Sequence, residues 1–528
     1  MALPQYKPLL FTTTMRNPGR LKQMLFILNK FDGQTLNDEL ASEIVAECIR
    51  YGIYRPIKQT QTIKDKWKTT AKGHFSRLLL TSKEVEYLIQ NNPQQHKEAG
   101  FAKGYPSRFA TIFDLCKELG LAYFNIGEPI EISELGHHLI DVLEVHEEGM
   151  TLLVKEVHPE YETEVFLQAF AKSQRKNPFV KVLNDNIPLI LLLETIKLLN
   201  ADPDFNSVGI SRKELPLLIF WKDNNAETLY SRIKQLRQEY RYNPSNEVIL
   251  DICINEIMGG NYKQFDAKSI MHDYPDEFIR KMRMTGLISL RGAGRFIDIN
   301  HNEDEKVSYV LEHYSIYPKF TDGRAYFDYM ANIDPNLFAI KAVEVSPSQS
   351  EELLKNWVDQ YNWKSIKEEL NILAKRHSSK DEVLRILAAP VRLEFLTALA
   401  IKSKLPHVRV IPNYATDDTG LPTSTAGGGI GDIECFEMTK GILVEVTMAE
   451  GRAQTIMEIW PIERHLTEFK EKYTDDSESI FVAPSIYPDS QRQIDYVTFT
   501  SKGKNKIRPY KIQDFIEFLE SAKHLYAI

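Results

Sequence analysis

Residues 431–448, GDIECFEMTKGILVEVTM, predict a β-hairpin with strands at 432–438 and 442–448 and a turn at 439–441. Side chains alternate between the faces of a strand, so Glu445 lies opposite the face that carries four apolar side chains. If the hairpin folds about Lys440, Asp432 lies nearly opposite Met448, and the carboxylates of Asp432 and Glu445 converge diagonally. Two converging carboxylates suit Mg²⁺, although isolated pairs of this kind can also be solvated or salt-bridged strand residues.

The segments on either side of this hairpin predict an α/β unit. The expected order is a helix from 390 through Glu394, a loop at 413–431, the hairpin, a helix at 453–473 and a strand at 479–482. Glu458 and His465 are seven residues apart, nearly two helical turns, and therefore share one face of the second helix. A lone histidine is often structural, but together with the strand carboxylates these side chains could line one side of a site.

Length and composition describe a folded protein of several domains. The chain has 528 residues, of which 43% are hydrophobic and 26% are charged, which excludes disordered and collagen-like chains. The longest strongly apolar stretch, 187–193, is shorter than the roughly 20 residues of a membrane span, and residues 1–10 lack the pattern of a secretory signal. The four cysteines are scattered along the sequence, which predicts reduced thiols in a cytoplasmic protein.

The charge distribution sets the start of the chain apart from the rest. The net charge is −8, yet residues 1–80 contain thirteen Lys and Arg against six Asp and Glu, a net charge of +7. Within this block, KQTQTIKDKWKTTAKGHFSR at 58–77 interleaves basic, hydroxyl, amide and aromatic side chains that can neutralise and hydrogen-bond phosphates. The alternative is an ordinary solvated surface.

Two segments predict a helix followed by a two-stranded wing. The first combines a helix at 107–119 with strands at 121–126 and 130–132, and the second a helix at 276–284 with strands at 287–290 and 296–299. A capping box at 211–214 and a basic helix at 226–240 precede the second wing. This order is a common way to place a helix in the major groove of DNA, although it also makes a stable small domain without that function.

Residues 346–385, with a capping box at 348–351, predict a helical connector.

Three segments carry a family resemblance. They are FTTTMRNPGR at 11–20, PVRLEFL at 390–396, and the stretch that runs from 431 through VEVT at 444–447 to Glu458, Pro461, Arg464 and His465. In this order, over essentially the whole chain, they resemble the AlwI family of type IIS restriction endonucleases, which includes related strand-specific nickases.

The resemblance implies a multidomain α/β protein with winged-helix DNA-recognition subdomains and a C-terminal PD-(D/E)XK-type nuclease domain. The implied divisions are a first recognition domain at 1–185, a second winged-helix-like domain at 186–340, a helical linker at 341–389 and a cleavage domain at 390–528. Carried over by position, the catalytic set is Glu394, Asp432, Glu445, Glu458 and His465. Asp432 and Glu445, supported by Glu394, would hold Mg²⁺. The lysine of the broader pattern is replaced by Thr447, which leaves open whether Lys440, His465 or a second metal supplies its charge.

Contacts with DNA are expected from the recognition half. The best candidates for phosphate contacts lie in the first 80 residues: Arg16, Arg20, Lys66, Lys68, Lys72 and Arg77. Base reading is expected at helix starts, from Ser107, Arg108, Arg212 and Lys213.

The expected activity is that of a Mg²⁺-dependent type IIS restriction endonuclease, which binds a short asymmetric double-stranded sequence and cuts at a fixed distance outside it. Cutting both strands would require transient dimerisation through the cleavage domains, and a cognate DNA methyltransferase is implied in the same restriction-modification system. The alternatives are a strand-specific nicking enzyme, or a winged-helix DNA-binding regulator with an inactive nuclease fold.

Overall fold

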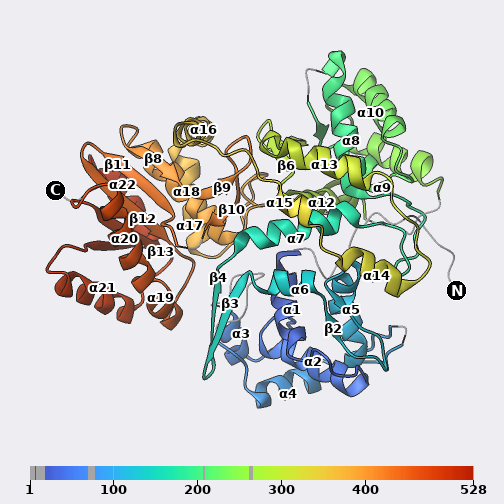
Figure 1. Ribbon diagram of the computed structural model, residues 1–528, viewed down its shortest axis with the longest axis horizontal. Helices are drawn as coiled ribbons and strands as arrows, with labels where there is room; N and C mark the ends of the chain where they lie inside the picture. Colours follow the sequence, from blue (N-terminus) through green and yellow to red (C-terminus); the bar gives the residue numbers. More distant parts are fainter. Residues whose placement is uncertain are drawn as a thin grey trace. The chain divides into compact units, whose positions relative to one another are not determined.

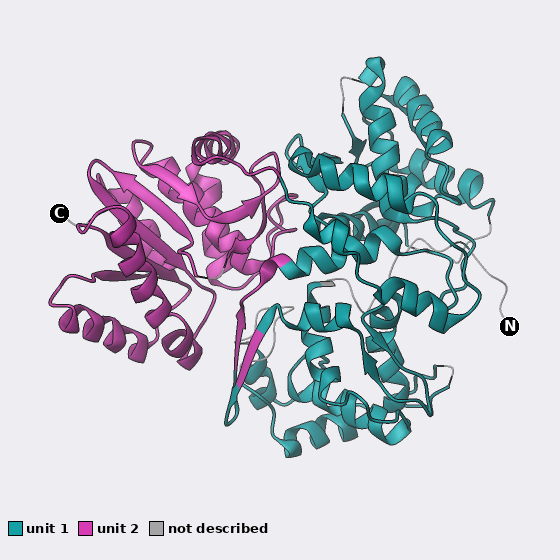
Figure 2. Cartoon of the chain, in the orientation of Figure 1, with its two compact units in different colours: residues 1–143, 147–152, 161–342 teal, residues 144–146, 153–160, 343–528 magenta. Residues whose placement is uncertain are grey.

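The structure is a computed structural model that describes Tyr6 and residues 18–68, 78–98, 100–205, 208–260, 266–427 and 429–526. The chain divides into two compact units (Figure 2). Unit 1 contains residues 1–143, 147–152 and 161–342, and unit 2 contains residues 144–146, 153–160 and 343–528. No helix in the described part of the chain is long and apolar enough to cross a membrane.

Unit 2 is built on a mixed five-stranded sheet (Figure 1). The strands follow the order β14-β13-β12-β11-β8, with β8 at Arg409–Pro412, β11 at Ile433–Glu437, β12 at Lys440–Val446, β13 at Glu478–Ala483 and β14 at Ile507–Lys511. β8, β11 and β12 pair antiparallel, whereas β12, β13 and β14 run parallel and are joined by helical crossovers. β12, which carries Glu445, is therefore the central strand, and Asp432 directly precedes its neighbour β11.

Helices cover both faces of this sheet. α20 (Ile459–Lys472) and α21 (Pro488–Thr500) share a buried cluster with Leu443 and Phe481 of the sheet, whereas α18 (Ala389–Lys404) and α22 (Ile512–Ser521) pack on the strands from the other side. Because Glu445 is two residues after Leu443, its side chain points to the α20 face. α16 (Pro347–Gln360) and α17 (Trp363–Ala374) pack on α18. Unit 2 is thus a sheet between layers of helices.

The predicted elements of unit 2 form, with four differences. The hairpin turns at Met438 and Thr439 rather than about Lys440, so its register moves by three residues. The region 413–431, expected as a loop, contains a small hairpin of β9 (Tyr414–Thr416) and β10 (Pro422–Ala426). The helix expected at 453–473 is broken at Glu458 into α19 (Arg452–Met457) and α20. The capping box of α16 is made by Ser346 and Gln349, not by the residues at 348 and 351.

The break in this helix has a local cause. Pro461 lacks a backbone N–H, and its ring would clash with the carbonyl of the residue four positions earlier in a continuous helix. The chain therefore stops α19 at Met457 and starts α20 at Ile459, which places Pro461 in the first turn. The break leaves Glu458 in an irregular position with φ −108° and ψ −48°. Its side chain is consequently aimed by the break rather than by a regular helix.

Unit 1 is mostly helical. The bounds of its helices are α1 Leu21–Asn29, α2 Asp38–Arg50, α3 Gln61–Lys68, α4 Ser82–Asn91, α5 Tyr105–Glu118, α6 Glu134–Ile140, α7 Pro159–Lys172 (whose first two residues belong to unit 2), α8 Pro188–Ala201, α9 Leu215–Phe220, α10 Ala226–Tyr240, α11 Asn246–Asp251, α12 Tyr274–Arg283, α13 Asp304–Tyr314, α14 Gly323–Ala331 and α15 Pro335–Ala339. Its strands are β1 Ala122–Tyr123, β2 Glu131–Ile132, β3 Leu143–Glu148, β4 Thr151–Glu156, β5 Ile210–Ser211, β6 Ile288–Arg291 and β7 Phe296–Ile299, of which β3 and β4 are divided between the two units.

Both expected wings are present as hairpins. β1 pairs with β2 after α5, and β6 pairs with β7 after α12. β5 adds a third strand to the second hairpin. The basic helix spans 226–240 as predicted. Ser211 and Glu214 make the reciprocal bonds of a capping box, at 3.3 and 2.8 Å, but α9 itself begins at Leu215.

All four cysteines are free and buried, as expected for reduced thiols.

Candidate active site

The hairpin register brings the two predicted metal ligands together. Ile433 pairs with Val444, so the next position along the same register sets Asp432 directly across from Glu445. The expected register, in which Asp432 lies nearly opposite Met448, was therefore wrong. The observed register brings the carboxylates of Asp432 and Glu445 closer than the expected diagonal approach would. The Val446 amide donates to Asp432 Oδ2 at 2.7 Å, and the two carboxyl groups are hydrogen-bonded to each other.

The loop before the hairpin fixes Asp432 from the other side. Asn413 donates its backbone N–H to the Asp432 carbonyl at 2.9 Å and its side-chain amide to the Gly431 carbonyl at 2.7 Å. A Cβ at Gly431 would lie 2.4 Å from Leu443 Cδ1 and 3.0 Å from Glu445 Oε1. Only glycine therefore allows the chain to pass this close to the Glu445 carboxylate. Sequence reasoning did not single out Asn413, because nothing in its neighbourhood marks an asparagine in a loop as a support.

His465 joins the carboxylate pair from α20. Its Nδ1 lies 2.9 Å from Glu445 Oε1, and its Nε2 is buried without a hydrogen-bond partner. Burial, followed by the charge of Arg464, lowers the pKa of His465, so the ring is neutral at pH 7. When Nδ1 donates to an ionised Glu445, Nε2 keeps its lone pair and can accept a proton.

Glu458 reaches the site through the helix break. Thr447 Oγ1 donates to Glu458 Oε1 at 2.9 Å and accepts from the Ala449 amide at 2.9 Å. Thr447 stands where the broader nuclease pattern has lysine, and it acts here as an orienting group for an acid rather than as a source of charge. The sequence marked Thr447 as a departure but gave no sign of this partner.

Glu394 enters from α18. It is 4% exposed, and its Oε2 accepts a hydrogen bond from the Ala426 amide of β10 at 3.0 Å. The β9–β10 hairpin that the sequence concealed therefore supplies its support. Burial and the neighbouring charge of Asp432 hold the pKa of Glu394 well above its usual range. The structure thus brings Glu394, an acid in a helix whose other central residues are buried, close to Asp432 and Glu445.

Burial and neighbouring negative charges raise the pKa values of three acids in the cluster, Glu394, Asp432 and Glu445. Burial and the charge of Glu445 raise the pKa of Asp432, while burial and the charge of Glu458 raise the pKa of Glu445 to about 8. Like charges in a site with little water cannot all ionise, so the cluster retains protons. A divalent cation would reverse this preference, because ionised carboxylate oxygens are the ligands Mg²⁺ takes. The donor set therefore fits Mg²⁺.

Two lysines differ in their relation to this cluster. Lys440 lies at the turn end of the hairpin, 3.4 Å from Asp476, and is removed from Glu445 by the length of β12. It is not placed to supply the missing charge. The positive charge of Lys155, a β4 residue in unit 2, lowers the pKa values of both Glu445 and His465. For each of these two groups, burial and other neighbouring residues have larger effects on the pKa. No sequence pattern had singled out Lys155.

The predicted DNA-contacting residues have varied surroundings in unit 1. Four of them, Arg16, Lys72, Arg77 and the side chain of Lys68, lie outside the described residues. Arg20 donates to the Ile53 carbonyl, and Lys66 forms an ion pair with Glu84 at 2.7 Å. The basic side chains of Arg20 and Lys66 therefore both bond to partners within unit 1.

Of the four residues expected to read bases, one is buried and the other three form hydrogen bonds within unit 1. Ser107 is buried, and its hydroxyl accepts a hydrogen bond from the Glu98 amide, so it presents nothing to a base edge. Arg108, half-buried, donates to Gln94 at 2.8 Å. Arg212 bonds to the Gly294 carbonyl and lies 3.3 Å from Asp276. Lys213 donates to Asn243 at 2.6 Å.

The mixed sheet of unit 2 and its helices thus gather four carboxylates and a neutral histidine near Asp432 and Glu445. The chain belongs to the AlwI restriction endonuclease family, whose sequence profile matches residues 117–339 and 348–518. Membership of a restriction endonuclease family makes it a site-specific nuclease.

Two solved structures are similar to parts or all of the chain. The small subunit (R.BspD6I2) of the heterodimeric restriction endonuclease R.BspD6I is 23% identical, with a TM-score of 0.26, over 30% of this chain and 78% of that one. The restriction endonuclease FokI bound to DNA is 12% identical, with a TM-score of 0.21, over 96% of this chain and 94% of that one. Comparison with curated proteins finds no match.

Proposed function

We propose that the protein is a type IIS restriction endonuclease, which binds a short asymmetric duplex sequence and hydrolyses phosphodiester bonds at a fixed distance outside it with Mg²⁺. The observation that carries the proposal is the hydrogen-bonded pair of Asp432 and Glu445. Burial and the charge of Glu445 raise the pKa of Asp432, and burial and the charge of Glu458 raise the pKa of Glu445. A buried acidic pair of this kind costs stability and is typical of a site that holds a cation. Residues 390–528 would form a cleavage domain of the PD-(D/E)XK type.

The roles follow from the contacts. Asp432 and Glu445 would hold Mg²⁺, with Glu394 as a supporting ligand. Mg²⁺, when bound there, would polarise the phosphodiester and stabilise the negative charge that develops during hydrolysis. His465 positions Glu445 through Nδ1 and offers Nε2 to a proton or a phosphate oxygen. Glu458, oriented by Thr447, would orient the attacking water.

DNA recognition is proposed for the two segments that precede the cleavage half. Residues 1–185 and 186–340 would each contribute a winged-helix subdomain, with 341–389 as the helical linker. The helix-plus-hairpin order of α5 with β1–β2, and of α12 with β6–β7, supports this division. Arg108 is the preferred base reader, because a long guanidinium side chain held by one neutral partner can exchange that partner for guanine. Ser107 is left out of the proposal, because its hydroxyl is buried.

Cleavage of both strands is proposed to need a second copy of the chain. One acidic site can act on one phosphodiester at a time, so a duplex cut requires two sites or two visits. Trp460 of α20 and Tyr496 and Phe499 of α21 expose 48%, 57% and 81% of their surface, and the Trp460 and Tyr496 rings lie 6.4 Å apart. Large exposed aromatic side chains of this kind mark interaction surfaces. These three residues form the proposed dimer surface.

The alternatives differ in what they predict for this surface and this site. A strand-specific nickase would use the same acidic cluster without pairing through the dimer surface. A DNA-binding regulator would have no use for acids whose pKa values are raised by mutual repulsion, and this cost disfavours it. A cytoplasmic location and a cognate DNA methyltransferase complete the proposal.

The test is a plasmid digest with and without Mg²⁺, followed by sequencing of the fragment ends. The wild type is compared with Asp432→Asn, Glu445→Gln and Phe499→Glu. The proposal expects linear fragments cut at a fixed distance from one shared short sequence, no cleavage by the two site variants, and nicked circles from Phe499→Glu. Nicked circles from the wild type at every protein concentration would favour the nickase. A wild type that shifts DNA in a gel but never cuts would overturn the nuclease assignment.

A further inference from the structure

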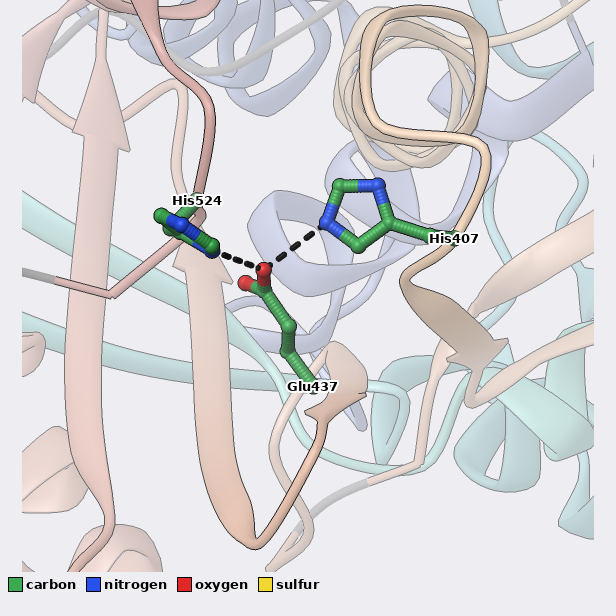
Figure 3. Close-up of side chains that lie close together, drawn as sticks. All are labelled: His407, Glu437 and His524. Atoms are coloured by element: carbon green, nitrogen blue, oxygen red, sulfur yellow. Dashed lines mark hydrogen bonds and ion pairs between the residues drawn. The ribbon is translucent and has the colours of Figure 1, made fainter.

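Three side chains converge at the end of β11 that lies away from Asp432 (Figure 3). Glu437 ends β11, His407 lies in the loop between α18 and β8, and His524 follows α22. His407 Nε2 lies 2.8 Å and His524 Nδ1 2.7 Å from the same oxygen, Glu437 Oε1. One potential ligand atom from each of the three residues lies within 4.8 Å of the other two. The acidic cluster of the proposed active site contributes none of these residues.

The backbone on both sides of this cluster is held in place. Lys402 donates to the carbonyls of Pro406 and Val408, at 3.0 and 2.8 Å, and so clamps the turn that carries His407. The amide of Leu525, which is fully buried, donates to Glu437 Oε2 at 2.8 Å and so anchors the residue after His524. Glu437 Oε2 is thereby occupied, while Oε1 is shared by the two imidazoles. This arrangement supports the three donor atoms from outside, as the neighbours of metal ligands do.

The geometry is close to that of a zinc site with one open position. Donor atoms bonded at about 2.1 Å to a tetrahedral Zn²⁺ lie about 3.4 Å from each other. The two measured donor separations, 2.7 and 2.8 Å, would need to open by less than 1 Å. The imidazole rings are inclined by 82°, so they approach Oε1 from different directions and do not stack. Two imidazoles and one carboxylate favour Zn²⁺ or a similar transition metal over Mg²⁺, which prefers oxygen ligands.

The position of the cluster indicates what a metal there would do. Glu437 is five residues along the strand from Asp432, roughly 16 Å at the rise of a β-strand, so the two sites lie at opposite ends of β11. His524 belongs to the segment after the last helix, whose Tyr526 ring lies 4.8 Å from Lys440 Nζ at the hairpin turn. A metal would therefore join the end of the chain to the sheet, away from the nuclease chemistry.

We propose that His407, Glu437 and His524 form a second metal site, which takes Zn²⁺ or a similar transition-metal dication and fastens the C-terminal segment to the β11–β12 turn. His407 and His524 exchange their hydrogen bonds to Glu437 Oε1 for bonds to the metal, and water completes the coordination. The site is structural, and its metal differs from the Mg²⁺ of the proposed active site.

The test measures Zn²⁺ binding to the full-length chain without an affinity tag, after treatment with EDTA. Asp432→Asn and Glu445→Gln are introduced together first, so that the acidic cluster does not bind the titrant. Isothermal titration with ZnCl₂ is expected to give one ion per chain. His407→Gln and His524→Ala are each expected to weaken binding at least about ten-fold, since loss of a ligand should cost no less than loss of a supporting contact. His301→Ala is the matched control, because His301 pairs with Asp304, at 3.1 Å, and lies outside the proposed metal site, so this replacement should leave binding unchanged.

A second readout distinguishes a structural site from adventitious binding. Zn²⁺ is expected to raise the melting temperature of the background protein and to leave that of His407→Gln unchanged. His407 is half exposed, so its replacement does not disturb the core. Absence of Zn²⁺ binding, binding that survives both His407→Gln and His524→Ala, or equal affinity for Mg²⁺ and Zn²⁺ would each overturn the proposal. DNA cleavage in Mg²⁺ is not used in this test, so its outcome is independent of the proposed nuclease function.

Discussion

Replacement of Glu445 by glutamine is expected to stabilise the metal-free protein, because the folded chain holds this carboxyl where it resists ionisation. Glu445 is 6% exposed, and burial together with the charge of Glu458 raises its pKa from 4.5 to about 8. A carboxyl whose pKa is raised by folding contributes its full stability below about pH 4.5, and that stability is lost as the pH rises toward 8. The carboxamide of glutamine mimics the protonated carboxyl and does not titrate.

The size of the effect follows from the same two pKa values. At 1.36 kcal/mol for each pH unit, the raised pKa of Glu445 lowers the free energy of unfolding by roughly 5 kcal/mol in full, roughly 3 kcal/mol at pH 7 and less than about 1 kcal/mol at pH 5, because the unfolded chain ionises this carboxyl more readily. For a unit of roughly 200 residues, 3 kcal/mol corresponds to a rise in melting temperature of about 6 to 12 °C. Glu445→Gln should therefore melt well above the wild type at pH 7 in EDTA and close to it at pH 5.

The assay is thermal unfolding followed by circular dichroism, in EDTA, from pH 5 to pH 8. Glu434→Gln is the matched control, because Glu434 lies on the same hairpin but accepts a hydrogen bond from the Tyr473 hydroxyl at 2.9 Å outside the acidic cluster. This control should lose a little stability at every pH. A Glu445→Gln protein that melts below the wild type at pH 7, or whose gain is equal at pH 5 and pH 8, would refute the reasoning.

Four further predictions concern the site and its recognition half. Mg²⁺ binding at pH 7 should release protons, on the order of one per chain, in calorimetry with buffers of different ionisation enthalpy, because the acidic cluster retains protons without a cation; proton uptake would contradict this. His465→Ala should slow single-turnover cleavage by about 10²–10⁴-fold with unchanged DNA binding, and a loss of only a few fold would remove His465 from proton transfer. Lys155→Met should move the pH–rate profile to higher pH, because the lysine lowers the pKa of Glu445, while Lys155→Arg should restore it; an unmoved profile would exclude Lys155. Arg108→Ala should cost about 1–3 kcal/mol of binding at one base position, and a uniform loss across sequences would indicate a phosphate contact instead.

The acids of the site were predictable because each stands out in its local pattern. Glu445 interrupts an apolar strand, and Glu394 interrupts a helix that is buried along most of its length. Charged residues rarely occupy such positions without a reason, since their burial is costly. The alternation of strand and helix likewise predicted an α/β unit, and the family resemblance named the remaining members of the set.

The register of the hairpin was not predictable, because its glycine serves packing rather than the turn. A Cβ at Gly441 would lie 2.6 Å from Phe469 Cε1 and 2.7 Å from Ser477 Oγ, so the glycine makes room for α20 inside the strand. The turn instead uses Met438, at φ +56°, which no turn preference indicates. A local pattern cannot reveal that Phe469, in a later helix, decides where a glycine is needed.

The partners of the site residues were also hidden from the sequence. Thr447 and Glu458 meet because Pro461 breaks the helix, and Ala426 supports Glu394 from a hairpin within a Thr-rich and Gly-rich segment that reads as a loop. His407, Glu437 and His524 are 30 and 87 residues apart along the chain, with no spacing that suggests a metal site. Such clusters arise from tertiary packing alone.

The most direct test of the account separates binding from cleavage at the acidic pair. Single-turnover cleavage of an end-labelled duplex that carries the mapped recognition sequence is measured in Mg²⁺ for the wild type, Asp432→Asn and Glu434→Gln, and DNA affinity is measured for the same proteins in EDTA. The account predicts that Asp432→Asn binds as tightly as the wild type and does not cleave, while Glu434→Gln does both. Cleavage by Asp432→Asn at the rate of Glu434→Gln would contradict the assignment of the active site.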